Sequence, residues 1–102
     1  MGEGKYILKG HEAIEVDDLI EWAILFEKLD RRVACDINGD VKVSTVFLGL
    51  DHQFGDGPPL LFETMVFGGE HDQDMDRYST WDEALDGHKQ ICKKVFNAEL
   101  KD

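Results

Sequence analysis

The dipeptide Asn38-Gly39 is the feature that most restricts how this chain can fold. It separates two runs rich in β-branched residues, Val33–Ile37 and Val41–Leu50. A two-residue type I′ turn needs positive φ at both central positions, and Asn-Gly meets that need best. The pattern therefore predicts an antiparallel hairpin. A further apolar run, Leu60–Phe67, ends at Gly68-Gly69 and extends the hairpin into a meander.

Two segments have the apolar spacing of amphipathic helices. The first runs from about Asp18 to Leu29, with an acidic start that suits the free amides of a first turn. The second follows Thr80, and Glu83 stands at its capping-box position. Its apolar stripe is Trp81, Ala84, Leu85, His88, Ile91, Cys92 and Val95. The sequence thus predicts one α+β domain over residues 1–102, a small antiparallel β-meander with two amphipathic helices packed on one face.

The net charge of −11 argues against two classes of partner. Binding to duplex nucleic acid and docking on anionic membranes both depend on basic residues, so we expect neither. The acidity leaves two interpretations open: a solubilising surface, or a surface that imitates DNA and meets a basic protein. No stretch has the roughly 18 apolar residues of a membrane span, and the first ten residues lack the apolar region of a secretory signal. We therefore expect a cytoplasmic protein with reduced thiols, although spacing alone leaves a Cys35–Cys92 disulfide open.

The acidic segment before the last helix has the spacing of a calcium-binding loop. Its oxygen-bearing side chains fall at positions 1, 3, 5, 7, 9 and 12 of such a loop. They are Asp72, Asp74, Asp76, Tyr78, Thr80 and Glu83. Arg77, however, occupies the sixth position, where the loop needs glycine for its turn. We therefore expect Glu70–Asp76 to be a solvated acidic loop, with calcium as the weaker alternative and no metal favoured.

The loop Asp51–Pro59 is the most suggestive candidate for ligand binding. Glycines let a ligand approach the backbone, and polar and aromatic side chains accompany them, namely His52, Gln53, Phe54 and Asp56. The alternative is a structural loop with Phe54 tucked beneath it. The cations Arg31, Arg32 and Arg77 either grip a phosphate or carboxylate or, for the first two, answer a helix dipole. Tyr78 and Trp81 supply aromatic faces for the same candidate pocket.

The sequence contains no recognisable catalytic or cofactor motif. Its histidines, His11, His52, His71 and His88, show no metal-ligand spacing with each other or with the cysteines. His88 lies on an apolar stripe and is expected to be a packed histidine. No serine or cysteine has the surroundings of an activated nucleophile, so we expect a non-enzymatic protein without a cofactor.

Several segments resemble an uncharacterised family of small bacteriophage and prophage proteins. They are Ser44–His52, Pro58–Gly69 and Arg77–Trp81, joined by Val16–Leu19 and Glu21–Ala23 in the first helix. The resemblance covers most of the chain, from about Tyr6 to His88. That family has no assigned activity, so the resemblance carries no site residues. It implies a phage accessory protein that works in a bacterial cytoplasm.

These observations together predict a phage binding protein that antagonises a bacterial defence system. In one version it sequesters a small nucleotide-type signal, and the pocket lies at a subunit interface of a homo-oligomer because a small domain has little interior room. In the alternative version it is an acidic, DNA-mimic-like inhibitor of a host or defence protein. A third role, as a metabolic or virion-assembly accessory, has no residue in its favour.

Overall fold

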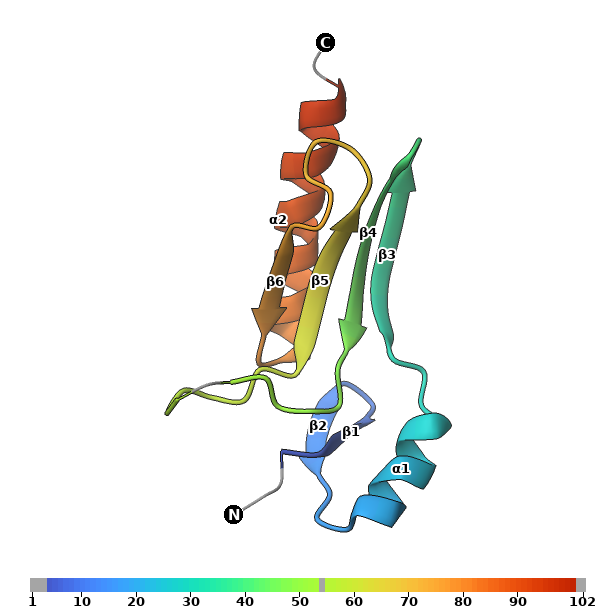
Figure 1. Cartoon of the computed structure of the whole chain (residues 1–102), viewed down its shortest axis with the longest axis vertical. Coiled ribbons are helices and arrows are strands. Elements are labelled where there is room, and N and C mark those ends of the chain that lie inside the picture. The colour runs from blue at the N-terminus through green and yellow to red at the C-terminus, as the bar shows by residue number, and fades with distance from the viewer. Residues whose placement is uncertain (1–3, 54, 101–102) are drawn as a thin grey trace.

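The computed structural model describes residues 4–53 and 55–100 of the chain. Its elements are a short hairpin, a helix, four strands and a long helix (Figure 1). They are β1 (Tyr6–Lys9), β2 (Glu12–Glu15), α1 (Leu19–Glu27), β3 (Arg32–Asn38), β4 (Val41–Phe47), β5 (Phe62–Phe67), β6 (Met75–Tyr78) and α2 (Trp81–Leu100). None of the helices in this part of the chain has the length and apolar character needed to cross a bilayer.

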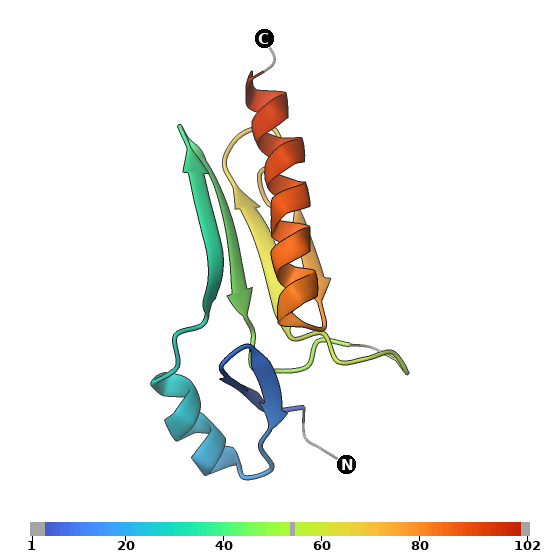
Figure 2. The same cartoon turned by 180° about the vertical axis from the view of Figure 1, so that it is seen from behind.

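Strands β3, β4, β5 and β6 form one antiparallel sheet in sequence order, and β1 pairs with β2 in a separate hairpin. Helix α2 packs along one face of the sheet and contacts all four strands, as Figure 2 shows. The predicted α+β class, with an antiparallel meander and a helix packed against it, is confirmed. The face of the sheet away from α2 is uncovered by any other element of the described chain (Figure 1).

Helix α1 lies at the end of the sheet, beside the β1–β2 hairpin, and does not share the sheet face with α2 (Figure 1). Its two aromatic side chains explain the position. The indole nitrogen of Trp22 donates to the carbonyl of Tyr6 at 2.8 Å, and the Phe26 ring lies 6.5 Å from the Phe47 ring. Gly49 leaves space for Phe26, since a methyl group there would overlap the ring. The helix therefore closes the end of the core.

The hairpin turn between β3 and β4 lies one residue further along than predicted. Asn38 pairs with Val41, so the two turn residues are Gly39 and Asp40. Gly39 has φ of 62°, whereas Asp40 is not among the described residues with positive φ. Glycine at the first central position is the arrangement of a type II′ turn. Asn38 thus extends the ladder, and glycine alone supplies the left-handed conformation.

Strand β6 replaces the end of the segment expected to be an acidic loop. Asp76 pairs with Thr64 and Arg77 with Glu63, whose carboxylate lies 3.1 Å from the Arg77 Nε. Aspartate has weak strand propensity, and the segment has no run of alternating apolar residues, so it lacks the usual sequence signal. The cross-strand ion pair and the edge of β5 supply the stabilisation instead.

The core consists of two apolar clusters separated by a row of polar residues. One cluster, at the α1 end, contains Leu8, Phe47, Leu61, Phe62 and Ala84. The other, at the opposite end of the sheet, contains Val41, Val43, Val66 and Val95. Between them Thr45 and Thr64 are fully buried, as is His88 at 2% exposure. The alternation of valine, threonine and phenylalanine along β4 produces this layering.

Gly87 fixes how closely α2 approaches β6. A methyl group at this position would overlap the ring of Tyr78. Replacing a helical glycine with alanine ordinarily stabilises a helix by about 1 kcal/mol. We predict the opposite sign here, because overpacking costs about 1–3 kcal/mol. Urea denaturation should show a lower unfolding free energy for Gly87→Ala, while Gln90→Ala at an exposed site of the same helix should be nearly neutral. Stabilisation by Gly87→Ala would contradict this packing.

Candidate functional site

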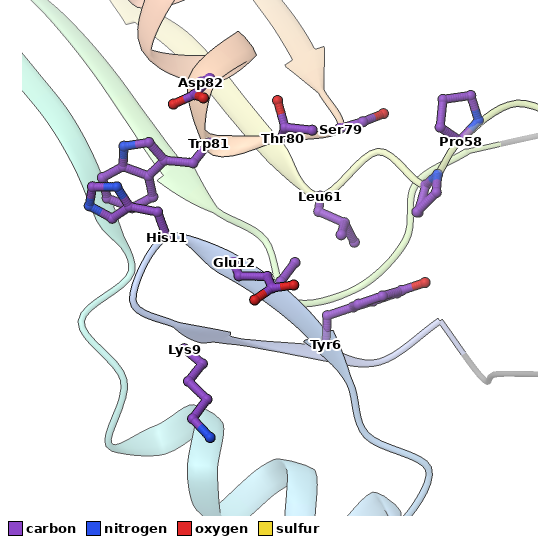
Figure 3. A pocket seen from close by; sticks show the side chains of 12 residues that line it. Tyr6, Lys9, His11, Glu12, Pro58, Leu61, Ser79, Thr80, Trp81 and Asp82 are labelled. Carbon is purple, nitrogen blue, oxygen red and sulfur yellow. The ribbon is translucent and has the colours of Figure 1, made fainter.

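A groove of about 660 Å³ lies where the β1–β2 hairpin meets the start of α2. Figure 3 shows the rings of His11 and Trp81 on one side, Tyr6 on the other and Leu61 between them. The remaining lining residues are Lys9, Glu12, Ala13, Pro58, Pro59, Ser79, Thr80 and Asp82. The volume lies within the range of small-molecule sites, roughly 300–1,000 Å³.

The two flat rings of the groove are held by local structure on both sides. His11 follows Gly10, whose φ of 64° makes the tight turn between β1 and β2. Its imidazole stacks on the Trp81 indole, with centroids 3.9 Å apart and planes 5° apart. Trp81 also meets the edge of Phe62 at 6.3 Å in the core. The indole is therefore clamped between the hairpin and the sheet.

Thr80 and Glu83 form a capping box at the start of α2, as the sequence predicts. The Glu83 carboxylate accepts from the amides of Ser79 and Thr80 at 3.1 and 3.2 Å. The Thr80 hydroxyl accepts from the Glu83 amide at 3.1 Å. The capping box thus satisfies the amides of Ser79, Thr80 and Glu83, and the side chains of Ser79 and Thr80 line the groove.

The charges around the groove are mixed in sign. Lys9 is its one lysine, and Glu12 and Asp82 supply two carboxylates. Burial raises the pKa of Tyr6, and the nearby carboxylates of Glu15 and Asp51 raise it further. The phenol thus remains protonated at neutral pH and can donate a hydrogen bond.

The predicted ligand-binding loop Asp51–Pro59 is mostly occupied with its own structure. The Asp51 carboxylate accepts from the amides of Gln53 and Leu60 at 2.8 and 3.0 Å, and the Gln53 side chain donates to the Pro58 carbonyl at 3.1 Å. Its two prolines line the groove, whereas His52, Gln53 and Asp56 do not. Phe54 lies outside the described residues. Of the predicted ligand-binding side chains that the structure describes, Trp81 is the one that lines the groove.

The three candidate arginines do not converge on the groove. Arg31 donates from Nε to the Phe47 carbonyl at 2.9 Å, and its guanidinium lies 4.9 Å from the centre of the Phe26 ring. Arg77 pairs with Glu63 across two strands, and Arg32 is exposed at the start of β3. Arg31 and Arg77 therefore have structural partners, and the structure forms no phosphate clamp from this set.

Tyr78, the other predicted aromatic residue, packs beside the groove rather than within it. Its ring lies against Gly87, and its hydroxyl is buried. Burial raises the pKa of Tyr78 more than the Thr64 hydroxyl lowers it. The residue thus belongs to the junction of β6 and α2.

The carboxylates of the predicted calcium loop have separate partners. Asp72 accepts from the Gly68 amide at 2.6 Å, and Asp76 accepts from the Arg77 amide at 3.0 Å within β6. Asp74 lies 3.1 Å from His71 and 3.7 Å from Lys94. Glu83 caps α2. Because β6 begins within the loop, these side chains are not gathered around one ion position.

A cluster of polar side chains that is separate from the groove was not predicted from the sequence. His88 Nε2 lies 2.7 Å from Asp36 Oδ2, and its Nδ1 lies 2.7 Å from the Thr45 hydroxyl, which also bonds to Thr64. Cys92 donates to the same Asp36 oxygen at 3.7 Å. His88 is packed, as predicted. The prediction that no histidine has metal-ligand spacing with a cysteine is wrong. His88 and Cys92 stand four residues apart on one face of α2.

The imidazole between a carboxylate and a hydroxyl has the residue types of a catalytic triad. The geometry does not permit that chemistry, because Thr45 and Thr64 are both 0% exposed. A nucleophile must reach the substrate, and these hydroxyls lie between the sheet and α2. The cluster orders the core at this point.

Comparisons with family models, with characterised proteins and with solved structures found no match for this chain. The resemblance to phage proteins therefore stays a prediction from the sequence.

The two free cysteines should differ strongly in reactivity. Cys35 is exposed, whereas burial, followed by the adjacent Asp36 carboxylate, raises the pKa of Cys92 to about 11. At pH 8 almost none of Cys92 is thiolate, which is the reactive form. Iodoacetamide labelling followed by mass spectrometry should modify Cys92 slowly in Cys35→Ser, and faster as the pH rises. Asp36→Asn removes a negative charge and should speed the reaction. Rapid, pH-independent labelling of Cys92 would contradict this environment.

Proposed function

We propose that the protein is a binding protein whose groove takes a small planar heteroaromatic ligand, with a nucleobase as the fitting chemistry. The observation that carries the proposal is the stacked pair His11 and Trp81, which faces Tyr6 across an apolar floor at Leu61 (Figure 3). Aromatic side chains bind bases by stacking, at about 1–3 kcal/mol per base. A groove with flat walls and few charges suits such a ring.

The polar rim of the groove narrows the class of ligand. Hydroxyls of Ser79 and Thr80, with Tyr6, can pair with the donor and acceptor edge of a heterocycle. The carboxylates of Glu12 and Asp82 oppose a highly phosphorylated ligand, since Lys9 is the one lysine among the described residues that line the groove. The sequence predicts a nucleotide-type signal as the ligand. The lining of the groove favours binding of the base of such a molecule and disfavours binding of several phosphates. Sequestration of such a molecule by a phage protein remains the biological role that we propose for this site.

A titration of tryptophan fluorescence tests the groove. The wild-type protein is used, because Trp22 holds the Tyr6 carbonyl at the groove, and adenosine, guanosine and their monophosphates are the probes. We expect saturable quenching by at least one nucleoside. His11→Ala should weaken binding about tenfold, because it removes roughly 1.4 kcal/mol of stacking.

His52→Ala is the matched control, because this histidine lies outside the groove. It should bind the nucleoside as the wild-type protein does. Absence of saturable quenching with all four probes would refute the proposal. An equal loss from His11→Ala and His52→Ala would also refute it, since the site would then lie elsewhere.

A second candidate function, inhibition of a protein partner, is favoured by the surface of α1. Four apolar side chains of this helix are exposed: Leu19 by 62%, Ile20 by 72%, Ile24 by 53% and Leu25 by 39%. Asp17, Asp18 and Glu21 lie around them at the acidic end of the helix. An exposed apolar helix face of this kind inserts into an apolar groove, and its acidic rim complements basic residues there. The fitting partner is thus a protein with an apolar groove edged by Lys and Arg.

The double variant Ile20→Ser with Ile24→Ser tests this second function. It should abolish capture of a basic-grooved protein from bacterial lysate, while His11→Ala should not. Capture should also weaken as salt rises, because charge pairs are screened. Light scattering of the purified protein distinguishes self-association. A dimer that the double variant dissolves would count against a foreign partner, as would capture that ignores both salt and the substitutions.

A further inference from the structure

We propose that Asp36, His88 and Cys92 form a binding site for a transition-metal ion of the zinc class. One ligand atom from each residue, Oδ2, Nε2 and Sγ, lies within 4.8 Å of the others. Carboxylate oxygen, imidazole nitrogen and thiolate sulfur are the three donor types that Zn²⁺ accepts. The mixed set with sulfur disfavours Ca²⁺ and Mg²⁺, which take oxygen ligands.

The fold brings these ligands together from two elements. His88 and Cys92 are four residues apart on α2, so they share one face of the helix. Asp36 lies in β3, one of the strands that α2 contacts, and it pairs with the buried Val43 of β4. An ion at this point would therefore join α2 to an edge strand of the sheet.

The imidazole is oriented as a metal ligand requires. Its Nδ1 is 2.7 Å from the Thr45 hydroxyl, which in turn bonds to Thr64. Metal-bound histidines normally hold the ring with such a hydrogen bond from the other nitrogen. In the protein without metal, Nε2 faces the Asp36 carboxylate, and because a carboxylate only accepts hydrogen bonds, this nitrogen is the one that carries the proton. On binding, this proton moves to Nδ1, where Thr45 accepts it, and the Cys92 thiol releases its proton to solvent.

Two of the three ligand separations are close to those around a tetrahedral ion. Tetrahedral Zn²⁺, with bonds of about 2.0–2.1 Å to nitrogen and oxygen, separates these two ligand atoms by about 3.3 Å. The observed separation of Nε2 and Oδ2 is 2.7 Å, and that of Sγ and Oδ2 is 3.7 Å. The Asp36 side chain is 59% exposed, so it can shift outward, and it leaves the fourth position open to water. His88 is 3% exposed and stays in place.

A Co²⁺ titration of the tag-free, reduced protein tests the site independently of the groove. Bound to thiolate, Co²⁺ gives a sulfur-to-metal charge-transfer band in the near ultraviolet, so the readout reports Cys92 directly. We expect this band to saturate at one Co²⁺ per chain and to be displaced by Zn²⁺. Zn²⁺ should also raise the melting temperature, because the three ligands are brought together in the folded state.

Three single variants complete the experiment, each checked for folding by circular dichroism. Cys92→Ser should lose the band, and Asp36→Asn should bind at least tenfold more weakly. Cys35→Ser is the matched control, since adjacent strand residues point to opposite faces and Cys35 faces away from α2. It should keep the band. The proposal is overturned if the folded wild-type protein gives no band up to millimolar Co²⁺. It is equally overturned if Cys92→Ser keeps the band or Cys35→Ser loses it.

Discussion

The hydrogen-bonded row of Asp36, Thr45, Thr64 and His88, in which all but Asp36 are buried, determines the register of this fold. Thr45 and Thr64 stand opposite each other on neighbouring strands, and His88 reaches them from α2. A buried hydroxyl or imidazole left without a partner costs about 1–3 kcal/mol. A slip of one residue between β4 and β5 would turn one threonine to the other face and leave the remaining groups unpaired. The apolar clusters on either side supply stability, but valines alone would tolerate such a slip far better.

The groove depends on the same row, although it lies at one end of the molecule. Trp81 precedes His88 by seven residues of α2, which is about 10 Å along a helix. The position of His88 on the sheet therefore fixes where the indole stands and how it meets Phe62. The hairpin is placed separately, since the Tyr6 amide donates to the Gly49 carbonyl at 2.8 Å beyond the end of β4. The two walls of the groove are thus positioned by two independent attachments to one sheet.

The sequence predicts the features that depend on residues close together in the chain. It does not predict those that depend on how separate helices and strands pack against each other. The capping box of Thr80 and Glu83 and the stripe of α2 are local patterns, and both are confirmed. Strand β6 has no such pattern, because the edge of β5 and the pair of Arg77 with Glu63 create it. His88 is packed, as its place on the apolar stripe predicts. Its hydrogen-bond partner Asp36 could not be predicted, because it lies 52 residues away in sequence. That partnership follows from the register of β3 and the docking of α2 together.

The same distinction applies to the candidate site. Trp81 was predicted because it begins a helix with an evident stripe, whereas His11 has no local signal. The stacking of His11 on Trp81 requires the turn at Gly10 to bring the hairpin back across the start of α2. The prediction that the arginines bind a ligand is not supported by the groove, because their local sequence pattern does not reveal the partner of each side chain. A cation that pairs with a backbone carbonyl, as Arg31 does with Phe47, has the same sequence signature as one that binds a ligand.

The net negative charge of the chain influences how its exposed apolar surfaces associate. Ile37, Phe67 and Met75 are exposed by 68%, 41% and 46% on the sheet face away from α2, and α1 exposes its own apolar side chains. Patches of this kind favour association with any apolar surface. Two copies that each carry −11 repel one another, and this repulsion opposes self-association without affecting a basic partner. In the second function that we propose, the charge and the apolar helix act together: repulsion opposes the pairing of like chains, and an apolar groove edged by positive charge is the surface that they favour.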